Sequence, residues 1–361
     1  MVSLVRSEPG ILASITDFDT DPLLFNVSNG TLDLRTGEVG PHTRGDLITR
    51  VVDIAFDRDA ACPRWLSFLE RISGQEAELP GYLQRVVDYL LTGSTTEQVL
   101  HFLYGLGANG KSVFCEIVAD LLGQYAIIVS PELVMAKRHQ GIPNDVARLR
   151  GARAALMNET SQGARFDEAK LKDLTGGDTL TGRFLHREYF DFMPTHKLLI
   201  RGNHKPSITG TDEGIWRRLR LVPFTVSIPA EEQDRQLLTK LRSELPGILA
   251  WAVRGCLEWQ RRGLLPPECV RAAGNEYRAE ADTLGRFIEE SCELGRLYEV
   301  KASILQSRYF RFCEEAGERA LPAKELPTEM ARRGFEHVRR KYGKLYLGVR
   351  LADAEVSSWQ D

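Results

Sequence analysis

The chain has 361 residues, of which 43% are hydrophobic and 27% are charged, and its formal net charge is −3. This is the composition of a water-soluble globular protein with two or three domains, and the near-neutral charge means that any nucleic-acid contact must be local. No apolar run is long enough to span a membrane, and the stretch "MVSLVRSEPG" lacks a signal core. We therefore expect a cytoplasmic protein without a membrane partner.

The predicted elements begin with two strands, "LLFNV" and "TLDLRTGEV", separated by the turn signal Ser28-Asn29-Gly30. Helical patterns follow in "CPRWLSFLERIS" and "LPGYLQRVVDYLLTG". From about 97 to 228, apolar strands alternate with helices, which predicts an α/β core. Residues 231 to 285 have the pattern of amphipathic helices. The segment 289 to 353 shows two helices and then a β-hairpin turning near Gly343.

The cysteines are scattered along the chain and never form a C-x-x-C pair. This spacing favours free thiols in a reducing cytoplasm over a zinc site or a disulfide framework. The six are Cys62, Cys115, Cys256, Cys269, Cys292 and Cys313.

The stretch "GLGANGKS" matches G-x-x-x-x-G-K-[ST] and lies between a predicted strand and a predicted helix. Its glycines allow the backbone N–H groups to turn toward phosphate oxygens, and the helix N-terminus adds partial positive charge. Lys111 would reach the β- and γ-phosphates of ATP, and Ser112 would ligate Mg²⁺. The predicted nucleotide contacts are Gly105, Leu106, Gly107, Ala108, Asn109, Gly110, Lys111, Ser112 and Val113.

The strand "GARAALMNET" ends at Glu159, a carboxylate that can orient and deprotonate the attacking water and contribute to the Mg²⁺ site. An acidic residue usually precedes it, but here that place is taken by Asn158. The strand "HKLLIRGN" ends at Asn203, whose amide can sense the γ-phosphate. Arg217 and Arg218 follow; adjacent arginines are most often surface residues, and the sharper hypothesis is an arginine finger that completes a neighbouring subunit's site.

Taken together, this order of motifs resembles the superfamily 3 helicases, and most closely the phage and plasmid primase–helicase group, whose relatives include the poxvirus primase–helicase. "LKDLTGGDTLTGRFLHREYFDFMPTHKLLIRGNHKP" is similar to that group's signature. The resemblance implies an AAA+ P-loop fold, a hexameric ring with ATP and Mg²⁺ at subunit interfaces, and 3′-to-5′ translocation on single-stranded DNA.

The resemblance also implies a DNA-contacting β-hairpin at about Thr179 to Phe192. His186 and Arg187 near its tip would face the ring pore and pair with backbone phosphates without reading sequence. Arg183, Lys170 and Lys172 are weaker candidates for the same contact.

The resemblance extends beyond the motor. It predicts an N-terminal helicase-associated domain (1–92), the ATPase domain (93–228), a helical subdomain (229–288) and a C-terminal winged helix (289–361). Between 296 and 350, thirteen Lys/Arg face seven Glu, a local excess of six positive charges. This excess favours duplex DNA as the partner of the winged helix, with a primase or initiator protein as the alternative.

Family members often carry a primase domain ahead of the helicase, and the first ninety residues show neither a Cys/His metal cluster nor a clear pair of acidic motifs. We therefore expect a separate primase or a stand-alone helicase in the cytoplasm of a bacterial host, encoded by a phage, prophage or plasmid. Two alternatives stay open: a non-motor AAA+ initiator or loader in which ATP controls assembly, and a P-loop small-molecule kinase.

Overall fold

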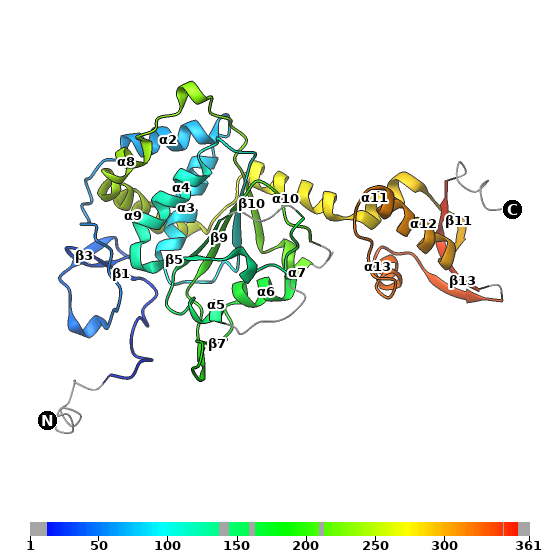
Figure 1. Cartoon of the computed structure of the whole chain (residues 1–361), viewed down its shortest axis with the longest axis horizontal. Coiled ribbons are helices and arrows are strands. Elements are labelled where there is room, and N and C mark those ends of the chain that lie inside the picture. The colour runs from blue at the N-terminus through cyan, green and yellow to red at the C-terminus, as the bar shows by residue number, and fades with distance from the viewer. Residues whose placement is uncertain (1–12, 137–143, 159–162, 209–212, 342, 353–361) are drawn as a thin grey trace. The chain divides into compact units, whose positions relative to one another are not determined.

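The computed structural model describes residues 13–136, 144–158, 163–208, 213–341 and 343–352. The chain divides into two compact units, Met1–Gly274 and Asn275–Asp361. The finer division into four domains stays a prediction. The ribbon diagram in Figure 1 labels the elements of both units.

The N-terminal strands form a small antiparallel sheet: β1 (Leu24–Val27), β2 (Gly30–Asp33) and β3 (Glu38–Gly40). The predicted turn is confirmed, because β1 ends one residue before Ser28 and β2 begins at Gly30. The predicted strand "TLDLRTGEV" is wrong as a single element. A turn in which the Gly37 N–H donates to the Asp33 carbonyl (2.8 Å) divides it into β2 and β3, and Gly37 has a φ of 72° there.

A five-stranded parallel sheet forms the centre of the larger unit, in the order β10-β4-β9-β6-β5. The strands are β4 (Leu100–Tyr104), β5 (Ala126–Val129), β6 (Ala154–Asn158), β9 (Lys197–Gly202) and β10 (Leu219–Pro223). Helices α4 (Lys111–Leu122), α5 (Asn144–Ala147), α6 (Glu168–Gly176) and α7 (Glu213–Trp216) lie between them in the chain. The predicted α/β core is confirmed, and its strands are apolar because both faces of a parallel sheet are covered.

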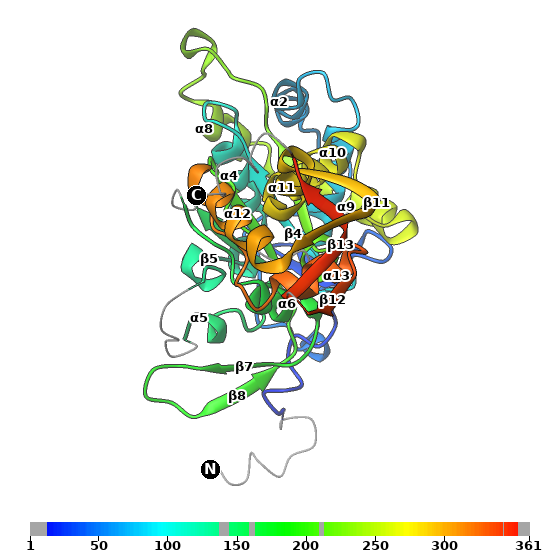
Figure 2. The same ribbon diagram turned by 90° about the vertical axis from the view of Figure 1, so that its right-hand side faces the viewer.

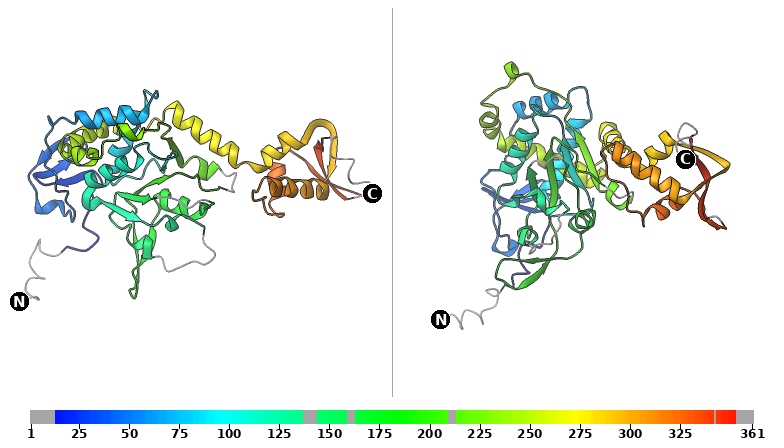
Figure 3. Two further views of the ribbon diagram at one scale, coloured as in Figure 1. Left: turned by 45° about the horizontal axis from the view of Figure 1, so that its top comes forward. Right: turned by 45° about the vertical axis from the view of Figure 1, so that its right-hand side comes forward.

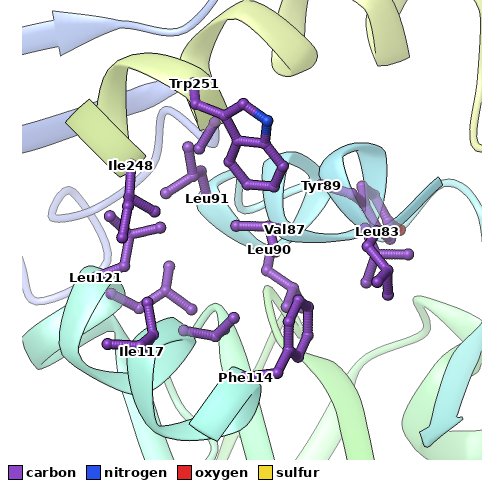
Figure 4. Close-up of a cluster of buried hydrophobic side chains, with 14 of the residues drawn as sticks. Leu83, Val87, Tyr89, Leu90, Leu91, Phe114, Ile117, Leu121, Ile248 and Trp251 are labelled. Carbon is purple, nitrogen blue, oxygen red and sulfur yellow. The ribbon is translucent and has the colours of Figure 1, made fainter. Parts of the chain in front are cut away.

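The main hydrophobic core lies between helices on one face of this sheet. The predicted helices α2 (Pro63–Ser73) and α3 (Leu79–Leu91) are confirmed, and α8 (Leu237–Arg242), α9 (Leu245–Arg262) and α10 (Glu268–Ala281) follow the sheet in the chain. In Figure 4, side chains of α3, α4 and α9 point toward one another, among them Val87, Phe114 and Trp251. Segments more than 150 residues apart in the chain therefore share one core.

Two buried cations bind carbonyls at the end of α3, and one of them, Arg153, also joins the N-terminal sheet to this core. Arg153 donates from one nitrogen to the Leu91 carbonyl at the end of α3 and from another to the Leu24 carbonyl of β1. Lys197 donates to the next carbonyl along, that of Thr92. Both cations thus satisfy carbonyls near the negative end of the α3 dipole, which offsets part of the cost of burying them. Burial still lowers the pKa of Arg153 to about 10.

A β-hairpin made of β7 (Leu180–Arg183) and β8 (Tyr189–Phe192) confirms the hairpin predicted at 179–192. It extends from the body of the larger unit (Figure 2). Its base rests on α5, because a Cβ at Gly182 would lie 2.8 Å from the Ala147 Cα.

The C-terminal unit has helices packed on a three-stranded antiparallel sheet of order β11-β13-β12 (orange and red in Figure 3). Its elements are α11 (Thr283–Ser291), β11 (Cys292–Lys301), α12 (Ala302–Glu315), α13 (Leu326–Arg332), β12 (His337–Arg340) and β13 (Gly343–Leu351). The predicted hairpin near Gly343 is confirmed by β12 and β13. Strand β11 was not predicted, because its mostly exposed residues lack a clean two-residue alternation.

Candidate nucleotide-binding site

The glycine-rich loop connects β4 to α4, as predicted. Gly105 must be a glycine, because a Cβ there would lie 2.2 Å from the Phe224 carbonyl oxygen. Gly110 has a φ of 83°, and a Cβ there would lie 2.5 Å from Ile72 of α2. The loop is therefore held between the residue that follows β10 and the helix α2.

Two polar side chains inside this loop are buried. Asn109 donates from Nδ2 to the Phe224 carbonyl (3.1 Å). Lys111 is only 5% exposed, and its Nζ donates to the Gly105 carbonyl (2.5 Å) and to the Asn109 Oδ1 (3.1 Å). Lys111 thus lies across the loop, with its ammonium group held by acceptors that a phosphate could replace.

A pocket of about 730 Å³ opens over the loop, a volume in the range of small-molecule sites. Residues 107 to 113 line it, which includes seven of the nine predicted nucleotide contacts, whereas Gly105 and Leu106 lie outside the lining. Asn203, at the end of β9, also lines this pocket. Because Tyr104 pairs with Gly202 in the sheet, the ends of β4 and β9 meet at one edge. The structure therefore brings Lys111, Ser112 and Asn203 together.

Sequence reasoning missed two walls of this pocket. Arg64, Ser67, Phe68 and Arg71 come from α2, and the opposite wall comes from residues between Ile228 and Lys240. An ion pair between Arg71 and Glu232 joins the two walls. No local motif marks these residues, since they lie about 40 residues before and 120 after the loop.

Glu159, the predicted base and metal ligand, lies outside the described residues. Asn158, the last residue of β6, is exposed. In the register of the sheet, Asn158 pairs with Arg201 of β9. Arg201 lines the pocket, and the sequence motifs did not single it out. The carboxyl edge of the sheet thus presents an amide and a guanidinium beside the glycine-rich loop.

Arg217 and Arg218 lie away from this pocket. They precede β10, whose first residue Leu219 pairs with Leu100, the first residue of β4. The glycine-rich loop follows the last residue of β4, so the two arginines are at the opposite edge of the sheet. Arg217 is exposed, whereas Arg218 is only 9% exposed and its Nη1 donates to the Gly214 carbonyl (2.7 Å).

The hairpin presents two of the predicted DNA contacts at its tip. The Arg187 N–H donates to the Phe184 carbonyl (3.0 Å), and His186 adopts a φ of 59°, which closes a tight turn with both side chains exposed. Arg183 is engaged within the hairpin, because its Nε donates to the Arg187 carbonyl and its guanidinium stacks 4.9 Å from the Tyr189 ring.

The tip also exposes apolar side chains that sequence reasoning did not single out. Phe184, Leu185 and Tyr189 are 42%, 57% and 58% exposed. The weaker candidates Lys170 and Lys172 lie on α6 and are half-buried.

In the C-terminal unit, Arg339, Lys341 and Lys344 are exposed on the β12–β13 hairpin. Two other cations of this unit are paired within it: Arg333 with Asp282 and Arg350 with Glu293, both at 2.6 Å. These ion pairs neutralise part of the positive charge counted in the sequence. The hairpin and the exposed Arg296 and Lys301 of β11 present positive charge to solvent. Among the described residues, no helix is long and apolar enough to cross a membrane.

The fold and the loop define an α/β protein with a P-loop-like core, and comparison with known proteins places it more closely. Residues 1–74 match the family described as "D5 N terminal like", and residues 103–218 match the "Family of unknown function (DUF5906)". A "Putative helicase" of Acanthamoeba polyphaga mimivirus is 27% identical over 307 residues, which cover 79% of this chain and 32% of the relative. A "Putative helicase" of Frog virus 3 is 30% identical over 219 residues, which cover 55% and 22%.

The chain thus spans about a third or less of the length of these relatives. In its fold it is similar to the apo C-terminal region of NrS-1, with a TM-score of 0.51, 10% identity and coverage of 85% of this chain and 81% of that one. These matches confirm the predicted resemblance to the primase–helicase family, and the relatives named here come from large DNA viruses.

Proposed function

We propose that this chain is an ATP-hydrolysing DNA helicase of superfamily 3 that acts in phage, prophage or plasmid replication. The observation that carries this proposal is the pocket in which the glycine-rich loop, Lys111 and Asn203 meet. The parallel sheet with this loop at its carboxyl edge supports an AAA+ core, and the names of the viral relatives support DNA unwinding as its purpose.

The pocket fits Mg²⁺-ATP. Lys111 would be the cation for the β- and γ-phosphates, and Ser112, in the first turn of α4, would ligate the metal together with Glu159. The metal ion would neutralise phosphate charge. Glu159 would orient and deprotonate the attacking water, and the Asn203 amide would hold the γ-phosphate or that water.

The positions of Arg217 and Arg218 support assembly into a ring. Arg217 and Arg218 lie at the edge of the sheet opposite the pocket, so neither serves the ATP site of its own subunit. A finger acting across an interface in a closed, hexameric ring explains both positions. The exposed Arg217 is the finger, and the buried Arg218 holds the Gly214 carbonyl.

Single-stranded DNA would pass through the ring pore in the 3′-to-5′ direction, gripped by the β7–β8 hairpin. His186 and Arg187 offer phosphate contacts, and Phe184 and Tyr189 offer faces on which bases can stack. In the C-terminal unit, the element order α11-β11-α12-α13-β12-β13 supports a winged helix, with the basic β12–β13 hairpin toward duplex DNA or toward a primase or initiator partner.

The test is ATP hydrolysis measured with and without single-stranded DNA, alongside strand displacement and a mass measurement with ATP. We expect hydrolysis stimulated by DNA, an oligomer in ATP, and loss of both activities in Lys111→Ala. Hydrolysis near the wild-type rate in that variant would contradict the proposal. Slow hydrolysis without strand displacement would instead indicate an initiator or loader, and hydrolysis indifferent to DNA would favour a small-molecule kinase.

A further inference from the structure

Arg201 lies on the face of the sheet that carries the glycine-rich loop's helix. It pairs in register with Leu103 of β4 and with Asn158 of β6. Two residues earlier on β9 and β6, Leu199 and Leu156 occupy the same face and belong to the core that α4 helps to form. Arg201 therefore continues this face to the carboxyl edge, where it lines the pocket.

The guanidinium of Arg201 is incompletely satisfied. Its Nε and Nη1 are buried and have no hydrogen-bond partner within the part of the chain that the structure describes. Buried guanidinium N–H groups without an acceptor are costly, and such groups mark places where a ligand supplies the missing acceptor. The positive charge of Arg201 acts on Cys115 of α4. Burial raises the pKa of Cys115 to about 12, and Arg201 and Lys111 both oppose this rise.

Asn158, the neighbour of Arg201 on β6, explains why the guanidinium can bind a ligand. Asn158 takes the position at which an acidic residue usually precedes the catalytic carboxylate. A carboxylate there would pair with Arg201 across adjacent strands, whereas the neutral amide leaves the guanidinium to a ligand of the pocket. The absence of the acidic residue and the presence of the arginine are thus parts of one arrangement.

We propose that Arg201 contacts the γ-phosphate of bound ATP from within the same subunit. This inference rests on the proposed ATP site. Backbone N–H groups of the loop would hold the inner phosphates, while Arg201 comes from β9, which leads to Asn203, the proposed contact of the γ-phosphate. A planar guanidinium donates two parallel hydrogen bonds to phosphate oxygens, which favours the triphosphate over the diphosphate.

The test compares the binding of Mg²⁺-ATPγS and Mg²⁺-ADP to the full chain and to Arg201→Met, a variant of similar side-chain length without charge. We expect ATPγS affinity to fall about 10- to 100-fold, as for the loss of a charged hydrogen bond, while ADP affinity changes little. Arg201→Lys should recover part of the difference, because it keeps the charge and loses the fork.

A structural role for Arg201 gives a different result. Removal of a guanidinium with two unsatisfied buried nitrogens should leave the Tm without nucleotide unchanged or raised, whereas replacement of a structural cation should lower the Tm. Arg261→Met is the control, since Arg261 of α9 is 73% exposed and does not line the pocket. That variant should keep the wild-type ratio of ATPγS to ADP affinity.

Asn158→Asp tests the pairing. The new carboxylate should engage Arg201 and reduce the preference for ATPγS, as Arg201→Met does. An unchanged or increased preference, or equal losses of ATPγS and ADP affinity in Arg201→Met, would overturn the inference. Failure of the wild-type chain to bind either nucleotide would instead overturn the proposed ATP site.

Discussion

Asp88 of α3 shows how closely two helices can approach around an ionisable group. The side chain is fully buried, and neither carboxyl oxygen has a hydrogen-bond partner among the described residues. Gly255 of α9 lies against it, since a Cβ there would come within 1.8 Å of the Asp88 Oδ2. Burial raises the pKa of Asp88 well above its ordinary value, and Arg85 offsets this only in part. Burial therefore favours the neutral acid form of Asp88 in the folded protein.

This raised pKa predicts a pH dependence of stability. Above the ordinary pKa of 3.8 the unfolded chain releases this proton while the folded chain keeps it. The contribution of Asp88 to stability is thus fully present below that pH and is lost as the pH rises toward the folded-state pKa. Asp88→Asn, which cannot ionise, should have a higher Tm than the wild type at pH 7, and the difference should shrink toward pH 4.

Thermal unfolding followed from pH 4 to pH 8 measures this difference. Asp59→Asn, an exposed change in the loop before α2, is the control and should leave the pH profile unaltered. A lower Tm for Asp88→Asn at every pH would show that the acid has a partner that matters more than its burial.

At the scale of the element, α2 couples the N-terminal region to the nucleotide pocket. Its first backbone N–H groups, those of Arg64 and Trp65, donate to the carboxylate of Glu244, which comes from the turn before α9 (3.2 and 3.0 Å). Farther along, Phe68 and Ile72 contact the loop at Gly110. A remote carboxylate thus caps the helix that supports the loop.

Glu244→Gln should destabilise the fold by about 0.5–2 kcal/mol, the usual worth of an N-cap. The amide keeps one acceptor and turns a donor toward the helix. Nucleotide affinity should fall as well, because α2 forms one wall of the pocket. Chemical denaturation and ATPγS binding measure the two effects. Glu258→Gln on α9, 50% exposed, is the control and should change stability by less than about 0.5 kcal/mol.

The β7–β8 hairpin is the proposed contact for single-stranded DNA. His186 and Arg187 lie at its tip and take no part in the pocket. Their joint replacement by alanine should leave basal ATPase largely intact and remove DNA stimulation and unwinding. The log–log salt dependence of single-strand binding should flatten by roughly 0.7 per lost phosphate contact.

Glu188→Ala, a change of the opposite charge at the same tip, should preserve or strengthen single-strand binding. Normal unwinding by the His186/Arg187 double variant would show that another part of the molecule holds the DNA.

For the whole molecule, the proposed finger and the pocket lie at opposite ends of the parallel strands, so the proposed function predicts that activity depends on assembly. Arg217→Ala should be inactive alone, as should Lys111→Ala. In an equal mixture that exchanges subunits, about a quarter of the interfaces pair an intact glycine-rich loop with an intact arginine, so part of the ATPase should return.

Arg218→Ala should behave differently in the same experiment. Because Arg218 is buried against the Gly214 carbonyl, its loss should lower the Tm and should not be complemented by the Lys111 variant. If ATPase activity returned in the mixture with Arg218→Ala but not in the mixture with Arg217→Ala, Arg218 would be the finger and Arg217 the structural residue.

Local patterns were enough to predict the glycine-rich loop, the α/β core and the hairpin. A loop that binds phosphate needs glycines, a lysine and a helix start within eight residues, so its chemistry is written in consecutive positions. Strands buried on both faces are apolar throughout, and helices keep a regular period. Strand β11 was missed because it lacks such a regular pattern, and the turn at Gly37 was not foreseen because it interrupts an otherwise strand-like segment.

Only the tertiary structure decided what surrounds the loop. The register of the parallel sheet sets Arg201 beside Asn158 and moves Arg217 to the far edge, although Arg217 is closer to Asn203 in the chain than Asn158 is. Helix packing brings Phe68 of α2 onto Gly110. No pattern within one segment encodes these neighbours, because burial and pairing between distant segments choose them together.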